Sequence, residues 1–248
     1  MADELIYEIC IDSAEGAVAA QDAGAHRVEL CNSLVEGGTT PSAGMIQTTR
    51  NLVDIGLQVI IRPRGSDFCY SSAEFEVMKR DVALAGEWSA DGVVIGVLNC
   101  DGSVDMDRTG ELVDLARPMS VPFHRAFDMV RDPHTALEDL VTLGIDRVLT
   151  SGLENSALEG LDLICDLVRQ AGDRIVVMPG GGIHERNVRK IVSESGVKEV
   201  HVSARREVES RMSFRNSRAF MGGEFRPPEF SHKATDAGRI RAFIDAVK

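Results

Sequence analysis

The sequence predicts an α/β protein with the fold of a (β/α)8 barrel, or TIM barrel, and three observations support that prediction. Eight short runs rich in β-branched residues alternate with longer amphipathic segments along the chain. The runs begin about 28 residues apart on average, which is the repeat expected for eight strand–helix units. The chain has 248 residues, and such a barrel typically needs about 250.

The predicted elements follow one another without a segment of linker composition, so we predict a single domain over residues 1–248. The strands are expected to begin near Ile6, Arg27, Gln58, Gly92, Val121, Arg147, Ile175 and Glu199. The helices are expected over residues 13–23, 41–55, 72–86, 105–117, 132–143, 157–171, 185–195 and 235–247. Three glycines (Gly24, Gly144 and Gly196) shortly precede predicted strands, where a left-handed glycine typically ends a helix.

Residues 204–234 are the exception to this regular alternation. They contain charged residues, glycines and Pro227-Pro228, and they show neither a helix period nor a strand period. We expect a long loop or arm after the eighth strand, because connections of this length in compact domains usually have a function. Such an arm would either cover the mouth of the barrel or contact a second subunit.

Composition excludes several classes of function. The net charge of −12 argues against nucleic acid as a partner, since a phosphate backbone requires a basic surface. No apolar run approaches the roughly 18–20 residues that cross a bilayer, so no membrane association is expected. The five cysteines are sparse and odd in number, which is typical of free thiols in a reduced compartment. We therefore expect a cytoplasmic protein.

Strand alternation places an unusual set of side chains inside the barrel. The apolar positions of each strand suit the side facing the helices, which leaves the polar positions pointing inward. The residues predicted to point inward are Ile6, Glu8, Cys10, Arg27, Glu29, Cys31, Ile60, Arg62, His124, His201 and Ser203. Barrel interiors are normally filled with branched apolar residues, and active sites lie where the strands end. This polar interior indicates either a functional cleft or a structural cluster of ion pairs, in which two carboxylates balance one or two cations.

Cys10 and Cys31 occur in the same Glu-x-Cys motif at the ends of two neighbouring strands. Adjacent strands lie about 4.8 Å apart, so both thiols are predicted to reach one small soft ion. Two thiolates alone favour Cu(I) over tetrahedral zinc. The alternative is that both cysteines pack as small buried hydrophobes.

Two further groups of residues suggest chemistry on an anion. Gly180, Gly181 and Gly182 follow the seventh strand, and Ser203 and Arg205 follow the eighth, where barrels often bind phosphate. The alternative for the glycines is a tight turn that needs positive φ.

A catalytic set is also predicted: His124 as general base with Asp128 as its orienting carboxylate, together with Glu29 and Arg62. The structural alternative is that His124 bonds Glu8 or Glu29 inside the barrel.

Several strings together resemble the CutC copper-homeostasis family. They are residues 27–31 (RVELC), 36–42 (EGGTTPS), 61–65 (IRPRG), 123–128 (FHRAFD), 149–152 (LTSG) and 214–216 (FRN). The resemblance spans nearly the whole chain, and it implies a cytoplasmic (β/α)8 barrel, a role in copper handling and Cu(I) binding by cysteines. The positions that match the cysteines at the strand ends of the family are Cys10 and Cys31.

Three hypotheses about function follow from these observations. The first is a copper homeostasis protein that binds Cu(I) through Cys10 and Cys31. The second is a barrel enzyme that acts on a small anionic or phosphorylated metabolite. The third is an assembly protein that uses residues 204–234, and a homodimer is the expected state because most soluble oligomers are two-fold symmetric.

Overall fold

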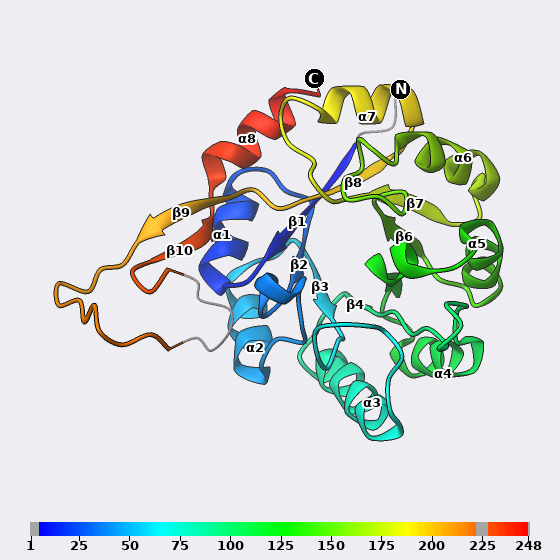
Figure 1. Ribbon diagram of the computed structural model, residues 1–248, viewed down its shortest axis with the longest axis horizontal. Helices are drawn as coiled ribbons and strands as arrows, with labels where there is room; N and C mark the ends of the chain where they lie inside the picture. Colours follow the sequence, from blue (N-terminus) through cyan, green and yellow to red (C-terminus); the bar gives the residue numbers. More distant parts are fainter. Residues whose placement is uncertain (1–4, 222–227, 248) are drawn as a thin grey trace.

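The computed structural model describes residues 5–221 and 228–247, and its first eight strands form a ring surrounded by helices (Figure 1). The strands of the ring are β1 (Ile6–Ile11), β2 (Arg27–Leu30), β3 (Gly56–Ile60), β4 (Gly92–Val94), β5 (Pro122–Phe123), β6 (Arg147–Thr150), β7 (Val176–Pro179) and β8 (Glu199–Val202). The helices are α1 (Ala14–Asp22), α2 (Ala43–Leu52), α3 (Ser72–Glu87), α4 (Met106–Ala116), α5 (Pro133–Thr142), α6 (Leu161–Ala171), α7 (Val188–Ser195) and α8 (Ala237–Asp245), with short 3-10 turns η1 (Leu34–Glu36) and η2 (Arg125–Met129).

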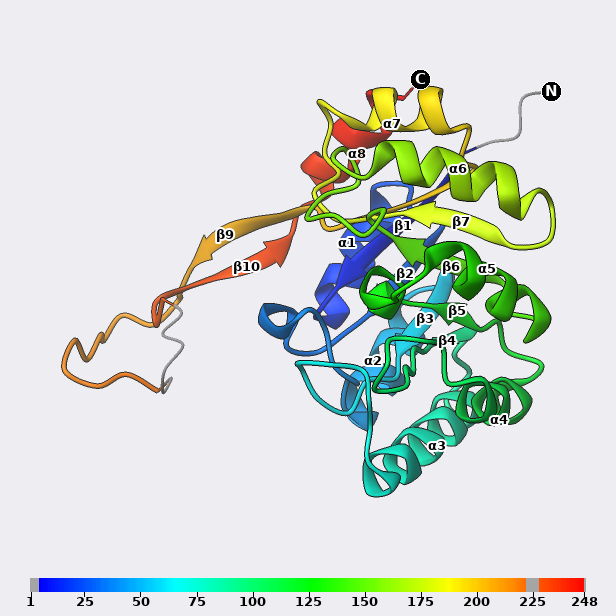
Figure 2. The ribbon, with the colours of Figure 1, turned by 45° about the vertical axis from the view of Figure 1, so that its right-hand side comes forward.

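The strand ladders confirm the predicted barrel. Parallel ladders join the strands in the orders β4-β3-β2-β1-β8 and β5-β6-β7, and the parallel bridge between Ile95 and Phe123 links the two sheets. Strands β7 and β8 complete the ring (Figures 1 and 2). In the described part of the chain no hydrogen-bonded ladder joins these two strands. Each predicted helix and strand overlaps an observed one. No helix among residues 5–221 and 228–247 has the length and apolar character needed to span a membrane.

Local sequence signals explain where these elements begin and end. The side chain of Ser71 caps α3 and that of Glu74 bonds back to the Ser71 amide, which forms a capping box. Gly144 and Gly196 have φ values of +70°, as the left-handed turns that lead into β6 and β8 require. These short joints hold the strands in register, and the register positions the site described below.

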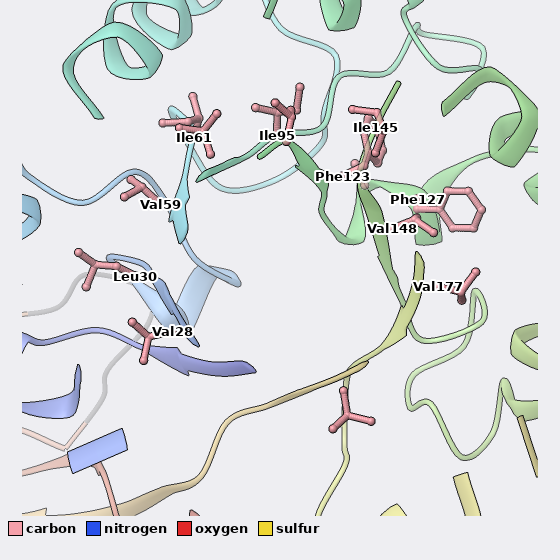
Figure 3. Close-up of a cluster of buried hydrophobic side chains, with 14 of the residues drawn as sticks. Val28, Leu30, Val59, Ile61, Ile95, Phe123, Phe127, Ile145, Val148 and Val177 are labelled. Atoms are coloured by element: carbon pink, nitrogen blue, oxygen red, sulfur yellow. The ribbon is translucent and has the colours of Figure 1, made fainter. Parts of the chain in front are cut away.

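Strand alternation divides the buried side chains into two separate groups. Figure 3 shows side chains such as Val28, Leu30 and Ile61 pointing away from the ring toward the helices. A separate apolar cluster inside the ring consists of Cys10, Cys31, Ile60 and Val94, with Leu34 packed against it. The prediction that both cysteines face the interior of the barrel is therefore confirmed.

The segment predicted as irregular forms a projecting hairpin. Strands β9 (Arg205–Glu209) and β10 (Ser231–Thr235) pair antiparallel, with Arg205 opposite Thr235, and the hairpin extends away from the ring (Figures 1 and 2). The predicted long arm after the eighth strand is therefore present, and the two strands within it were not predicted. These strands are rich in charged residues and largely exposed, so they lack the apolar alternation that identifies a half-buried strand. Residues 222–227 of this segment, like residues 1–4 and 248, lie outside the described residues.

Candidate functional site

The polar interior is organised by the register of three neighbouring strands. Glu8 on β1 lies opposite Arg27 on β2 and opposite His201 on β8. Cys10 lies opposite Glu29, so the two Glu-x-Cys motifs are displaced by two residues instead of being level. This displacement brings a cation to each side of Glu8 and places the Glu29 carboxyl group beside both thiols.

Glu8 is the centre of a buried ion network. Its carboxylate accepts hydrogen bonds from Arg27 Nε at 2.5 Å and from His201 Nδ1 at 2.7 Å. Arg27 also pairs with Glu199, which Arg147 Nε contacts at 3.1 Å. Burial alone would raise the pKa of Glu8, but the hydrogen bond from His201 and the charge of Arg27 outweigh it and lower this pKa to about 2. The cations that balance this carboxylate are thus Arg27 and His201.

The two predicted metal ligands lie side by side above this network. The distance between Cys10 Sγ and Cys31 Sγ is 3.9 Å, and Cys31 Sγ lies 3.4 Å from Glu29 Oε2. One ligand atom from each of the three residues lies within 4.8 Å of the other two. All three residues are buried, with Cys31 1%, Glu29 4% and Cys10 8% exposed. Two soft sulfur atoms and one carboxyl group are therefore close enough together to contact one ion.

Contacts within the cluster set different protonation states for its members. The hydrogen bond from Cys31, with help from His201 and Arg205, lowers the pKa of Cys10 to about 5 against the effect of burial. The same contact with Cys10, together with burial, raises the pKa of Cys31 well above its ordinary value. Burial raises the pKa of Glu29 to about 8, and the negative charge of Cys10 adds to this effect. These contacts therefore favour the thiolate form of Cys10 and the protonated forms of Cys31 and Glu29.

His201 completes the cluster as an imidazolium ion. Burial disfavours its charge, but the acidic groups of Glu29, Cys10 and Glu8 outweigh burial and raise the pKa of His201 well above its ordinary value. Its Nε2 lies 3.7 Å from Glu29 Oε2, on the opposite side of the ring from the bond to Glu8. Carboxylate, imidazole and thiolate thus follow in the order that activates cysteine nucleophiles. The same order supports a metal-binding thiolate, because second-shell contacts orient and tune the ligands.

Arg62 does not contact either carboxylate. Its Nη1 donates to the carbonyl oxygens of Glu36 and Gly38 at 2.7 and 2.9 Å, and its Nη2 donates to that of Ser66 at 2.9 Å. Gly38 packs so closely on Cys31 that an added Cβ would lie 3.2 Å from its sulfur. Arg62 thereby holds in place the loop that covers Cys31.

His124 and Asp128 do not form the predicted pair. His124 Nδ1 accepts the backbone N–H of Ala126 at 3.1 Å, and its Nε2 is buried without a partner among the described residues. Asp128 instead accepts hydrogen bonds from Arg125 Nε at 2.6 Å and Thr150 Oγ1 at 2.5 Å. The residues between them form the tight turn η2, which directs the two side chains to different neighbours. The structural alternative of a bond from His124 to Glu8 or Glu29 is likewise not formed in the described part of the chain.

The predicted anion-binding residues fall into two groups. Gly181 and Gly182 have φ values of +92° and +67°, so this loop makes the tight turn that was the alternative interpretation. A Cβ on Gly181 would lie 3.3 Å from Arg125 Nη1, which makes Arg125 the nearest guanidinium group to the loop, whereas the amide of Gly180 continues the ladder to Thr150. Arg205 turns instead to Ser203 Oγ at 3.0 Å and Asp12 at 3.5 Å.

Two residues of the site had no predicted role, namely Arg27 and His201. Alternation already placed both inside the barrel, and Glu8 was placed there with them. The available signal was electrostatic, since a buried carboxylate requires a cation next to it. The sequence did not reveal the strand register, which determines which cation contacts the Glu8 carboxylate.

Comparison with known proteins agrees with this architecture. Residues 5–206 match the CutC family. The chain is 53% identical to the copper homeostasis protein cutC homolog of Mus musculus, over 95% of this chain and 87% of that protein. It is 52% identical to the homolog of Homo sapiens, over 97% of this chain and 88% of that protein.

A solved structure gives the same result. The putative copper homeostasis protein CutC from Streptococcus agalactiae superposes with a TM-score of 0.76 at 34% sequence identity, covering 79% of this chain and 97% of that one. The ring of strands, the cysteines at its mouth and the match to the family over residues 5–206 lead to one conclusion. The chain belongs to the CutC family.

Proposed function

We propose that this chain acts in copper homeostasis by binding one Cu(I) ion between Cys10 and Cys31 in the cytoplasm. The observation that carries the proposal is the pair of sulfur atoms 3.9 Å apart inside the barrel mouth. Metal–thiolate bonds of about 2.3 Å, the value for zinc, let one ion bridge sulfurs up to about 4.6 Å apart. Soft thiolates select Cu(I), and all five cysteines are free, as expected in a reducing compartment.

The protonation states support a site with two sulfur ligands. The contact with Cys31 and the neighbouring imidazolium of His201 lower the pKa of Cys10 and favour its thiolate. Burial raises the pKa of Glu29 and favours its protonated form, which makes its carboxyl group a weaker ligand than the sulfurs. Two thiolates without a strong third ligand suit the low coordination number of Cu(I) better than tetrahedral zinc.

Anaerobic titration with Cu(I) against a chromophoric chelator tests the proposal. The wild-type chain should take up one ion in competition with the chelator, and the variants Cys10→Ser and Cys31→Ser should each lose most of this affinity. Cys165→Ser is the matched control, because Cys165 lies on α6 and contacts the carbonyl oxygen of Glu194 at 3.5 Å. If the double variant of Cys10 and Cys31 retains the wild-type stoichiometry and affinity, the proposal is wrong.

A second candidate function is binding of a small anionic or phosphorylated metabolite by an enzyme site at the same mouth. At this mouth His124 Nε2 is buried without a hydrogen-bond partner among the described residues, and the side chains of Arg62 and Tyr70 interact with each other. Burial, with the charge of Arg62, lowers the pKa of His124 to about 3, so the ring is neutral. Since Nδ1 accepts a backbone N–H, the proton lies on Nε2. The Nε2–H of His124 is therefore a buried donor that lacks an acceptor, which an anionic oxygen would supply.

Thermal unfolding in inorganic phosphate or sulfate tests this second candidate. The anion should raise the Tm of the wild-type chain, and His124→Phe and Arg62→Met should each reduce that rise. Arg169→Met is the control, since Arg169 is exposed on α6. An equal rise in all four chains would show that the anion acts elsewhere, and no rise would exclude an anion site for these probes.

We also propose that the arm predicted at residues 204–234, of which residues 204–221 and 228–234 are described, joins two copies of the chain into a homodimer. Met212, Phe214 and Met221 on this arm are strongly exposed, and large exposed apolar side chains are typical of contact surfaces. Light scattering should show a dimer that Phe214→Asp dissociates, whereas Met129→Asp, a change at an exposed methionine outside the arm, should not. A wild-type chain that is monomeric at micromolar concentration would contradict this proposal.

A further inference from the structure

A second pair of cysteines lies at the surface, on two loops that follow neighbouring strands of the barrel. Cys69 is in the loop between β3 and α3, and Cys100 is in the loop between β4 and α4. Their sulfur atoms are 2.8 Å apart. Cys100 is exposed and Cys69 is half-buried, so small oxidants reach this pair directly. We propose that Cys69 and Cys100 form a reversible disulfide that ties these two loops together.

The backbone around the pair is already held in place for such a bond. Leu98 N–H donates to the carbonyl oxygen of Phe68 at 2.9 Å, which joins the two loops immediately beside the cysteines. The amide of Cys69 donates to Asp67 Oδ1 at 3.1 Å, and Gly102 N–H closes a turn onto the carbonyl oxygen of Asn99 at 2.9 Å. The sulfurs therefore need to approach by less than 1 Å to reach the roughly 2.05 Å of a disulfide.

The interior pair, Cys10 and Cys31, is built differently. Its sulfurs are 3.9 Å apart, and the strand register displaces the two residues by two positions along adjacent strands. With about 4.8 Å between strands and about 3.3 Å per residue, their Cα atoms lie roughly 8 Å apart. A disulfide spans at most about 7 Å between Cα atoms. The interior pair therefore suits an ion between its sulfurs, and the surface pair suits a covalent bond.

Oxidised glutathione serves as the oxidant in a balanced reaction. The Cys100 thiolate attacks one sulfur of glutathione disulfide, which forms a mixed disulfide and releases one glutathione thiolate. The Cys69 thiolate then attacks the Cys100 sulfur and releases the second glutathione. Two protein thiols lose their protons and two electrons, and one glutathione disulfide becomes two molecules of reduced glutathione. Excess reduced glutathione reverses both steps.

The bond would act on the barrel mouth through Phe68, the neighbour of Cys69. The guanidinium carbon of Arg62 lies 5.0 Å from the centre of the Phe68 ring, and the rings of Phe68 and His124 are 5.1 Å apart. Phe68 thus covers both side chains, and its loop bears one of the two sulfurs. Oxidation would restrict the motion of Phe68, because the disulfide would join the β3–α3 loop covalently to the β4–α4 loop.

The test is oxidation of the reduced full chain with glutathione disulfide, blocking of the remaining thiols with N-ethylmaleimide, and mass spectrometry of the intact chain and of a non-reduced digest. We expect a chain about 2 Da lighter before blocking, a peptide that links Cys69 to Cys100, and loss of that link on reduction. The oxidised chain should also unfold several degrees higher, because the bond closes a loop of 31 residues.

Three variants make the result decisive. Cys69→Ser should leave a stable glutathione adduct on Cys100, and Cys100→Ser should abolish the cross-link, whereas Cys165→Ser should form it like the wild type. If the wild-type chain accumulates glutathione on Cys100 while Cys69 remains free, or if Cys10 and Cys31 cross-link instead, the proposal is overturned. Formation or failure of the Cys69–Cys100 bond does not bear on copper binding, since the surface pair is not part of that site, whereas a Cys10–Cys31 bond would remove both proposed copper ligands.

Discussion

The Glu8→Gln substitution removes one negative charge from the interior of the barrel and leaves the shape of the side chain unchanged. In the wild-type chain this carboxylate receives hydrogen bonds from Arg27 at 2.5 Å and from His201 at 2.7 Å. Arg27 keeps its contact with Glu199 in the variant. His201 loses the partner of its Nδ1, and its buried positive charge is then less well compensated.

Two independent arguments give the size of the expected effect. The pKa of Glu8 falls from 4.5 to about 2 on folding, and about 1.4 kcal/mol per pKa unit gives about 3 kcal/mol of stabilisation at neutral pH. Breaking a buried ion pair by removal of one partner generally costs about 3–5 kcal/mol. Glu8 is 1% exposed, so solvent does not screen these interactions. We therefore expect Glu8→Gln to lower the free energy of unfolding by about 3 kcal/mol at pH 7.

Urea unfolding at several pH values checks both the size and the origin of this effect. Because folding lowers the pKa of Glu8, its stabilisation is complete above pH 4.5 and is lost as the pH falls toward 2. The difference between wild type and variant should shrink to about 1.5 kcal/mol at pH 3. Glu154→Gln, a change at an exposed glutamate, should stay within about 0.5 kcal/mol of wild type. A deficit at pH 7 below that limit, or one that does not change with pH, would refute the reasoning.

The same structure predicts two further changes. His201→Gln should raise the pKa of the Cys10 thiol, because one of the contacts that lowers it is lost; iodoacetamide should then label the Cys10 peptide about tenfold more slowly at pH 6.5, and an unchanged rate would contradict the assigned role of His201. Gly92→Ala should cost about 1–3 kcal/mol in urea unfolding, because the added methyl group would overlap Gln58 Oε1 and Ser120 Oγ. Gly44→Ala on α2 is the control, because the added methyl group meets nothing within 4 Å. This variant should raise the free energy of unfolding by at most about 1 kcal/mol. Equal losses of stability in both variants would argue against the packing around β4.

The sequence was sufficient to predict the face of each strand. Valine, leucine and isoleucine at alternate positions, such as Val28 and Leu30, identify the side that packs on the helices, so Cys10 and Cys31 had to face the interior. The observed separation of the two apolar clusters follows this pattern. The spacing of strands and the glycines before them were likewise sufficient for the barrel, because each unit repeats one local plan.

Strand register and side-chain pairing were beyond the reach of the sequence. A period of two residues states which face a side chain occupies, but sliding one strand by two residues preserves that pattern. The level arrangement of two Glu-x-Cys motifs and the observed displacement therefore look identical in the sequence. Only the displaced register brings Glu8 to Arg27 and His201, and Glu29 to the thiols. Arg62 and His124 were predicted as members of a catalytic set with Glu29 and Asp128, whereas loop carbonyl groups hold Arg62 and a tight turn holds His124.

The distribution of protons in the cluster argues for a monovalent ion between the sulfurs. The contacts within the cluster lower the pKa of Cys10 and raise those of Cys31 and Glu29, which favours one negative charge on the two sulfurs together. Replacing the Cys31 proton by Cu(I) leaves the buried charge unchanged. A divalent ion would add a positive charge unless Glu29 also lost its proton, and an uncompensated charge in this enclosed site would be costly. Glu8 stabilises the positive charge of His201, and His201 in turn stabilises the thiolate of Cys10. With Cys31 as the second sulfur ligand, this arrangement favours Cu(I) over Zn(II).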